Sequence, residues 1–121
     1  MNAEEMKLRT KNFAIDVGKL VLSLAKNDIN RNYSNQIIRS SSSVAANYRA
    51  VRRAKSTADF INKLKIVEEE LDESLFFLEL ILEFNQSKKD LIENIYKEGE
   101  VLLKIIVATI NTTRNKQIKT S

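Results

Sequence analysis

Residues 44–74 read VAANYRAVRRAKSTADFINKLKIVEEELDES, and this stretch decides the fold. A basic run that ends at Lys55 is followed by an acidic run from Glu68 to Glu73. Between the runs, residues 56–59 (Ser-Thr-Ala-Asp) have the form of a capping box that starts a helix, with Asp in place of the usual Glu. The stretch predicts a helical hairpin whose arms carry opposite charge, which is typical of a protein that binds or self-assembles.

The two arms extend well beyond the quoted stretch. After the capping box, apolar residues recur at gaps of three and four, which predicts a helix over 57–84. Before it, the same periodicity predicts a helix over 34–55, with Ser34 or Asn35 as N-cap. The serine run at 40–43 has the composition of a flexible linker, but the periodicity continues through it and favours a helix interior.

Two outer helices complete the pattern, over 4–27 and 88–114, with residues 27–30 as a turn and a frayed polar tail over 115–121. Gly18 lies inside the first of them, where it costs about 1 kcal/mol relative to alanine, and a close helix–helix approach is the usual compensation. The sequence therefore predicts an all-α fold: a single domain over 1–121, built as an antiparallel up-down-up-down four-helix bundle.

Composition supports this fold class. The chain has 121 residues, no proline and two glycines, whereas β-rich and loop-rich folds normally need more turn residues. Cysteine and histidine are both absent, which excludes disulfides, thiolate chemistry, histidine general bases and the Glu-x-x-His motif of di-metal bundles. We expect no enzyme activity, no cofactor and no metal, and we interpret the glutamates after residue 67 as a solvated face or as partners of basic groups.

The start of the chain, Met-Asn-Ala-Glu-Glu, lacks the basic and apolar regions of a signal peptide. The apolar runs are only a few residues long, whereas a membrane-spanning helix needs about 20 predominantly apolar residues. The sequence thus predicts a cytoplasmic protein with no membrane partner.

Net charge is +4 but unevenly placed, with six basic and one acidic residue in 28–56 and two basic and eight acidic residues in 57–86. Arg49, Arg52 and Arg53 have i, i+3, i+4 spacing and form one local patch. Arginine grips phosphate bidentately, so the patch is a candidate nucleic-acid site. The alternative is a structural role, at the helix dipole or in ion pairs with the acidic arm. The candidate contacts are Arg39, Arg49, Arg52, Arg53, Lys55 and Lys63.

The third helix carries more apolar surface than one core-facing stripe uses, notably at Phe76 and Phe77. Either the core is broad or a face is buried against another subunit. We favour a homo-oligomer whose interface includes Glu69, Glu73, Phe76 and Phe77, the acidic pair meeting the basic arm.

These residues resemble a known family, the four-helix-bundle proteins of the 23S ribosomal RNA intervening-sequence type. The similarity is strongest over residues 41–50, 53–56, 59–60 and 64–70, and extends over roughly 10–113. The chain departs from the commoner pattern at Arg49-Ala50, where many members have Glu-Gly, and at Glu69-Glu70, where many have Gly-Ser.

The resemblance implies a bacterial protein that assembles as a homopentameric barrel. It also implies similarity to the accessory bundle protein of diversity-generating retroelements, which has a basic surface and binds nucleic acid and a reverse transcriptase. Two hypotheses follow: a non-enzymatic protein associated with RNA through its basic patch, or a protein-interaction scaffold without nucleic-acid contact.

Overall fold

The computed structural model describes residues 2–120 and the side chains as far as Ile118. Its helices are α1 (Ala3–Ser23), α2 (Asp28–Val51), α3 (Thr57–Phe84), a short 3₁₀ helix η1 (Gln86–Lys88) and α4 (Lys89–Thr120). Since the described residues form four α-helices and no strand, the all-α expectation is confirmed. Within this range, none of the helices combines the length and apolar character that crossing a lipid bilayer requires.

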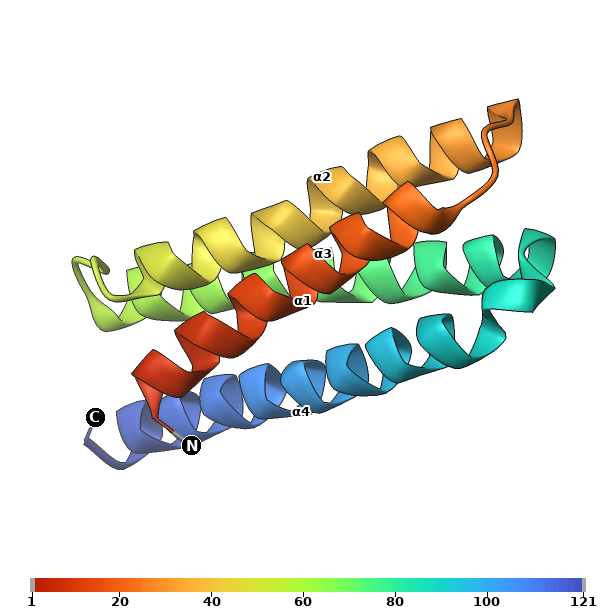
Figure 1. The fold of residues 1–121 in the computed structure, drawn as a ribbon. Coiled ribbons are helices and arrows are strands. Elements are labelled where there is room, and N and C mark those ends of the chain that lie inside the picture. The colour runs from red at the N-terminus through yellow and green to blue at the C-terminus, as the bar shows by residue number, and fades with distance from the viewer. Residues whose placement is uncertain (1, 121) are drawn as a thin grey trace.

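The helices are arranged so that each contacts two others (Figure 1). Helix α2 packs against α1 and α3, and α4 packs against α3 and α1, whereas the described backbones of α1 and α3 stay further apart and only their side chains meet in the core. Helix α1 crosses obliquely between α2 and α4, and the α2–α3 turn lies at the opposite end of the bundle from the other two connections (Figure 1). The basic turn is therefore displayed at one end of the molecule.

The core is made by the residues that the helical periodicity predicts. In α3, Leu64, Val67, Leu71 and Leu78 are almost completely buried, as spacings of three and four require for one helix face. The apolar periodicity does not place every large apolar residue inward, since Ile38 and Leu91 are exposed. Helix α4 instead turns Ile92 inward.

The serine run belongs to the interior of α2, which confirms the helical interpretation. Ser40 is fully buried and its hydroxyl lies 2.8 Å from that of Ser74 on α3. The Ser74 hydroxyl also bonds the Glu70 carbonyl at 2.8 Å, so neither hydroxyl is unsatisfied. Small side chains at this position let α2 and α3 approach each other with their polar groups paired.

The first connection differs from the prediction. Helix α1 ends at Ser23, and α2 begins at Asp28, so Ser34 and Asn35 lie inside the helix and neither is its N-cap. Asn27 takes that role, because its side chain accepts a hydrogen bond from the Asn30 backbone. The buried Asn30 amide pairs reciprocally with Asn85, at 2.8 and 3.1 Å, which fastens the start of α2 to the end of α3.

The remaining ends also differ from their predicted positions. Helix α2 ends at Val51, four residues before Lys55. The last helix was predicted to start at Lys88, but Lys88 belongs to the 3₁₀ helix η1 and α4 begins at Lys89. The tail predicted to fray over 115–121 continues α4 as far as Thr120, and Ser121 lies outside the described residues.

The close helix–helix approach that the sequence suggested at Gly18 occurs at Gly99 instead. Apart from the backbone of α1 itself, no atom of the described residues would lie within 4 Å of a Cβ at Gly18, so none of the other helices approaches it closely. A Cβ at Gly99 would lie 2.7 Å from Leu75 Cδ2 and 3.0 Å from Phe13 Cε1. Gly99, in the middle of α4, is therefore the residue that lets α1 and α3 side chains pack against the α4 backbone.

We predict that Gly99→Ala destabilises the protein. The added methyl overpacks the core by an amount that outweighs the roughly 1 kcal/mol gain in helix propensity, leaving a net loss of about 1 kcal/mol or more. This loss of stability is measured by urea unfolding followed by circular dichroism. Glu100→Ala, at an exposed neighbour on the same helix, is the matched control and should leave the midpoint nearly unchanged; equal midpoints for both variants would contradict this account of Gly99.

Candidate nucleic-acid interface

The basic turn between α2 and α3 is held by backbone hydrogen bonds. After Val51, the Arg53 amide donates to the Ala50 carbonyl at 3.0 Å, and the Ala54 amide donates to the Val51 carbonyl at 3.1 Å. These bonds continue the helix for part of a turn before the chain leaves it. The α2 C-terminus therefore presents Arg52 and Arg53 on an ordered segment.

The predicted capping box is formed. The Ser56 hydroxyl accepts from the Asp59 amide at 3.0 Å, and the Asp59 carboxylate accepts from the Lys55 amide at 2.9 Å. This is the reciprocal pattern of a capping box, with the shorter aspartate reaching back beyond the N-cap. It fixes the backbone that carries Lys55.

Lys63 takes part in the same small network. Its ammonium lies 2.8 Å from both carboxylate oxygens of Asp59, one helical turn earlier. The Lys63 hydrogen bonds, together with the one from the Lys55 backbone, lower the pKa of Asp59 below its ordinary value of 3.8. Lys63 therefore has an intramolecular partner that supports the start of α3.

Arg39 lies away from the turn and bridges two helices. Its guanidinium donates to Glu70 at 3.1 Å and pairs with Glu73, both on α3. It lies ten residues before Arg49 on α2, which separates the two by about 15 Å along the helix axis. The structure thus pairs a basic residue of α2 with the acidic arm inside one chain, as the structural alternative expected.

Arg52 has a carboxylate partner as well. It pairs with Glu4 at the start of α1, and both side chains are substantially exposed. The neighbouring Tyr48 is half-buried against the core, and this burial raises the pKa of its hydroxyl. Tyr48 therefore packs against the core.

Arg49, Arg53 and Lys55 are the remaining predicted contacts, and all three are exposed. Within residues 2–118, whose side chains are described, none of them forms an ion pair with a carboxylate. They form the accessible part of the predicted patch, and we call these three residues the basic turn cluster.

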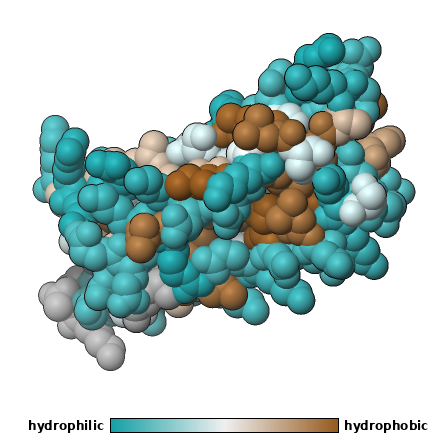
Figure 2. All heavy atoms as spheres, viewed as in Figure 1, coloured by the Kyte–Doolittle hydropathy of each residue, from teal (hydrophilic) through white to brown (hydrophobic). Residues whose placement is uncertain are grey.

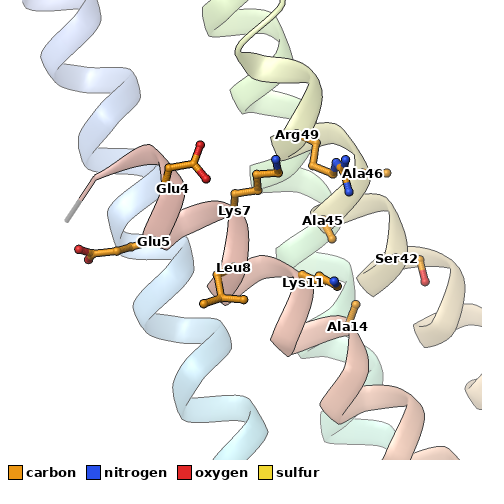
Figure 3. A pocket seen from close by; sticks show the side chains of 10 residues that line it. All are labelled: Glu4, Glu5, Lys7, Leu8, Lys11, Ala14, Ser42, Ala45, Ala46 and Arg49. Atoms are coloured by element: carbon orange, nitrogen blue, oxygen red, sulfur yellow. The ribbon is translucent and has the colours of Figure 1, made fainter.

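Two cations that the sequence analysis did not single out lie beside Arg49. Lys7 and Lys11 of α1 line the same groove of about 810 Å³, and Figure 3 shows Lys7 extending from α1 toward Arg49. Their i, i+4 spacing was visible in the sequence, but the face of α1 that adjoins α2 was not. The basic surface therefore spans two helices.

The four residues proposed for an interface have different surroundings. Glu69 is exposed, and Phe76 is 53% exposed and contacts the half-buried Phe77 edge-on at 5.4 Å between ring centres. Phe77 also lies 6.2 Å from the Tyr33 ring of α2. Glu73 is engaged by Arg39 within the chain. Among the described residues, no group of carboxylates is arranged to hold a metal ion.

We predict that Asp59→Asn lowers the melting temperature at neutral pH. Because the folded state lowers the pKa of Asp59, its stabilising effect is fully present above 3.8, the ordinary value, and is lost as pH falls through the lowered folded value. Melting curves of wild type and variant should therefore converge in strong acid. A difference that is unchanged by acid would show that the carboxylate charge is not responsible.

We predict that Arg39→Gln destabilises the bundle by at most about 1 kcal/mol, since the pair is partly exposed and screened by water. The measurement is urea unfolding followed by circular dichroism. A much larger loss of stability would contradict a partly exposed, water-screened pair.

Comparison with known proteins gives a consistent result. Residues 5–108 match a family model described as 23S rRNA-intervening sequence protein. The chain is also similar to a solved structure from Bacteroides thetaiotaomicron, a protein of unknown function from the S23 ribosomal protein family. The two share 30% identity with a TM-score of 0.79, over 92% of this chain and 99% of the other. A search of curated proteins found no match.

Proposed function

Since the chain belongs to the family of 23S rRNA-intervening sequence proteins, we propose that it is a non-enzymatic, RNA-associated four-helix bundle that binds RNA through the basic turn cluster. The proposal rests on a difference among the basic residues of this chain, some of which have carboxylate partners while others do not. Arg39, Arg52 and Lys63 have carboxylate partners, whereas Arg49, Arg53 and Lys55 are exposed and without one in the described structure.

The chemistry of these three residues suits a phosphate backbone. A guanidinium offers two parallel donors to phosphate oxygens, and an ammonium adds a point charge. Binding by neutralised phosphates is governed by counterion release, so affinity falls steeply as salt rises and depends little on sequence. The capping box supports such binding because the cluster is already ordered and loses little conformational freedom on contact.

The acidic residues of α3 limit where RNA can bind. The exposed side of α3 carries Glu69, Asp72, Glu79 and Glu83, which repel a phosphate backbone. RNA is therefore confined to the end of the bundle where α2 meets α3 and to the adjoining Lys7 and Lys11. This geometry favours contact with one end of the molecule over wrapping around it.

We further propose that the working form is a cytoplasmic homo-oligomer of antiparallel bundles, pentameric as the family resemblance implies. Repetition of a small cluster on several subunits raises the apparent affinity for one RNA well above that of a single copy. Three cations alone bind a phosphate backbone only weakly at physiological salt. The affinity for RNA therefore depends on several copies of the cluster that bind one RNA together.

A second candidate function is a protein-interaction scaffold that binds no nucleic acid. Exposed apolar residues favour it, notably Leu8, Leu22 and Phe76, which are 57%, 87% and 53% exposed. On this alternative, the basic surface serves protein contacts and the chain is indifferent to RNA.

We predict that Arg53→Glu combined with Lys55→Glu weakens RNA binding and flattens its salt dependence. Each lost phosphate contact reduces the magnitude of the slope of log K against log salt by about 1, so the slope of the double variant should be smaller by about 2. The measurement is fluorescence anisotropy of a labelled 23S rRNA fragment, titrated at several salt concentrations. A duplex DNA of equal length reports whether RNA is preferred.

Lys97→Glu combined with Lys104→Glu is the matched control, because it makes the same charge change at exposed positions of α4. This control should retain most of the wild-type affinity. Equal losses in both double variants would show a diffuse charge effect and contradict the assigned surface. If the affinity of the wild type for RNA does not change with salt, or if the wild type does not bind RNA, the protein-interaction scaffold is favoured.

A further inference from the structure

Two hollows meet at the end of the bundle that carries the α2–α3 turn. The first, of about 270 Å³, lies among the start of α1, the end of α2, the start of α3 and the second half of α4. The second, of about 440 Å³, follows the turn itself and is lined by Lys55. Val51, Arg52 and Phe60 line both hollows, so the two adjoin. We call the first the inner hollow and the second the outer hollow.

The inner hollow is lined mostly by apolar and aromatic side chains. Tyr48 and Phe60 contribute two aromatic rings, and both residues are partly buried against the core. The surface over the α2–α3 turn is mostly hydrophilic in the view of Figure 2, so the hollow adds apolar contact that this outer surface lacks. The aliphatic and thioether groups around the rings come from Met6, Val51, Ile105 and Ile106. A lining of this kind suits a flat ring with apolar faces.

Hydroxyl groups add polar contacts to the inner hollow. The Thr109 hydroxyl donates to the Ile105 carbonyl at 2.8 Å and can still accept a hydrogen bond. Within the described residues, the Tyr48 hydroxyl has no hydrogen-bond partner, so it can both donate and accept. The hollow therefore offers hydrogen bonds to the edge of a ring as well as contact with its faces.

The two hollows differ in charge. Of the described residues that line the inner hollow, Arg52 is the only charged one, and it pairs with Glu4. The outer hollow contains Lys55, whose ammonium has no carboxylate partner within residues 2–118. Arg53, two residues earlier in the chain, is exposed beside it. The inner hollow thus suits a neutral group, and the outer hollow suits an anion.

A nucleotide combines a neutral aromatic base with an anionic phosphate. We propose that the inner hollow receives one unpaired base of the bound RNA, while Lys55 and Arg53 hold a neighbouring phosphate. Tyr48 and Phe60 then supply the aromatic surface on which proteins stack unpaired bases. Tyr48 precedes Arg52 by one helical turn, about 6 Å along the axis, which is the scale of a single nucleotide.

This inference rests on the proposed RNA association and specifies its substrate class, which is RNA with unpaired nucleotides. The bases of a duplex are paired and stacked, so one of them reaches the inner hollow only after it has been extruded. A duplex is therefore held by phosphate contacts alone. Contact with a neutral base releases no counterions, so its contribution to affinity does not change with salt.

The test compares two labelled single strands that carry the same phosphates, one an ordinary RNA and the other with stable abasic spacers in place of its nucleotides. In fluorescence anisotropy, wild type should bind the ordinary strand about tenfold or more tightly than the abasic strand. Thr109→Leu fills the inner hollow without a change of charge. It should bring the ratio of the two affinities close to one and leave the salt dependence unchanged.

Thr112→Leu is the matched control, because it makes the same change at an exposed position of α4 outside both hollows. It should keep the wild-type ratio, and circular dichroism should show wild-type helicity for both leucine variants. Arg53→Glu with Lys55→Glu should weaken binding of both strands while the ratio between them stays above one.

Photo-crosslinking provides a readout on the wild type that needs no variant. A single strand that contains 4-thiouridine should crosslink to the lining of the inner hollow, at Met6, Tyr48 or Phe60, as mapped by mass spectrometry. Crosslinks that avoid these three residues, or a Thr109→Leu variant that keeps the preference for bases, would overturn the inference. Equal, salt-dependent binding of both strands by wild type would remove the base site and leave RNA association intact. Failure to bind either strand would overturn both proposals.

Discussion

The packing of α2 on α3 is the constraint on which the rest of the structure depends. The two helices meet through small side chains, and the buried Ser40 and Ser74 hydroxyls satisfy each other across the contact. The capping box at Ser56 fixes the hairpin at one end, and the reciprocal Asn30–Asn85 amide pair fixes it at the other. Helices α1 and α4 then cover the remaining apolar surface.

This hairpin also determines the electrostatics. The basic arm and the acidic arm lie side by side, so part of their charge is neutralised inside the chain by Arg39 with Glu70 and Glu73. The charge that remains is segregated, with cations at the α2–α3 turn and along α1, and carboxylates on the outer side of α3. Because the segregated charges lie on different faces, the described surface has a basic end and an acidic side.

Local signals in the sequence were sufficient for the fold. The capping box, the apolar periodicity of α3 and the helical nature of the serine run all depend on residues within a few positions of one another. The start of α2 was missed because Asn27 and Asn30 have the composition of a turn. They form instead an N-cap and a contact with Asn85, which lies 55 residues away in the chain.

The site was less predictable because it depends on the register between helices. That Arg39 faces Glu70, or that Arg52 reaches Glu4, follows from how helices are rotated and shifted against each other, which periodicity does not specify. The same holds for Lys7 and Lys11 beside Arg49, and for the close approach of side chains at Gly99 in place of Gly18. The sequence identified a basic group, and the structure divided it into paired and accessible cations.

The central claim is that RNA contacts the end of the bundle that carries the basic turn cluster and leaves the charged surface of α4 free. The most direct measurement is lysine acetylation of the wild-type protein with and without bound 23S rRNA fragment, mapped by mass spectrometry. The account predicts that RNA protects Lys55 from acetylation and leaves Lys97 and Lys104 on α4 as reactive as before. Protection of the α4 lysines with Lys55 still reactive would contradict it.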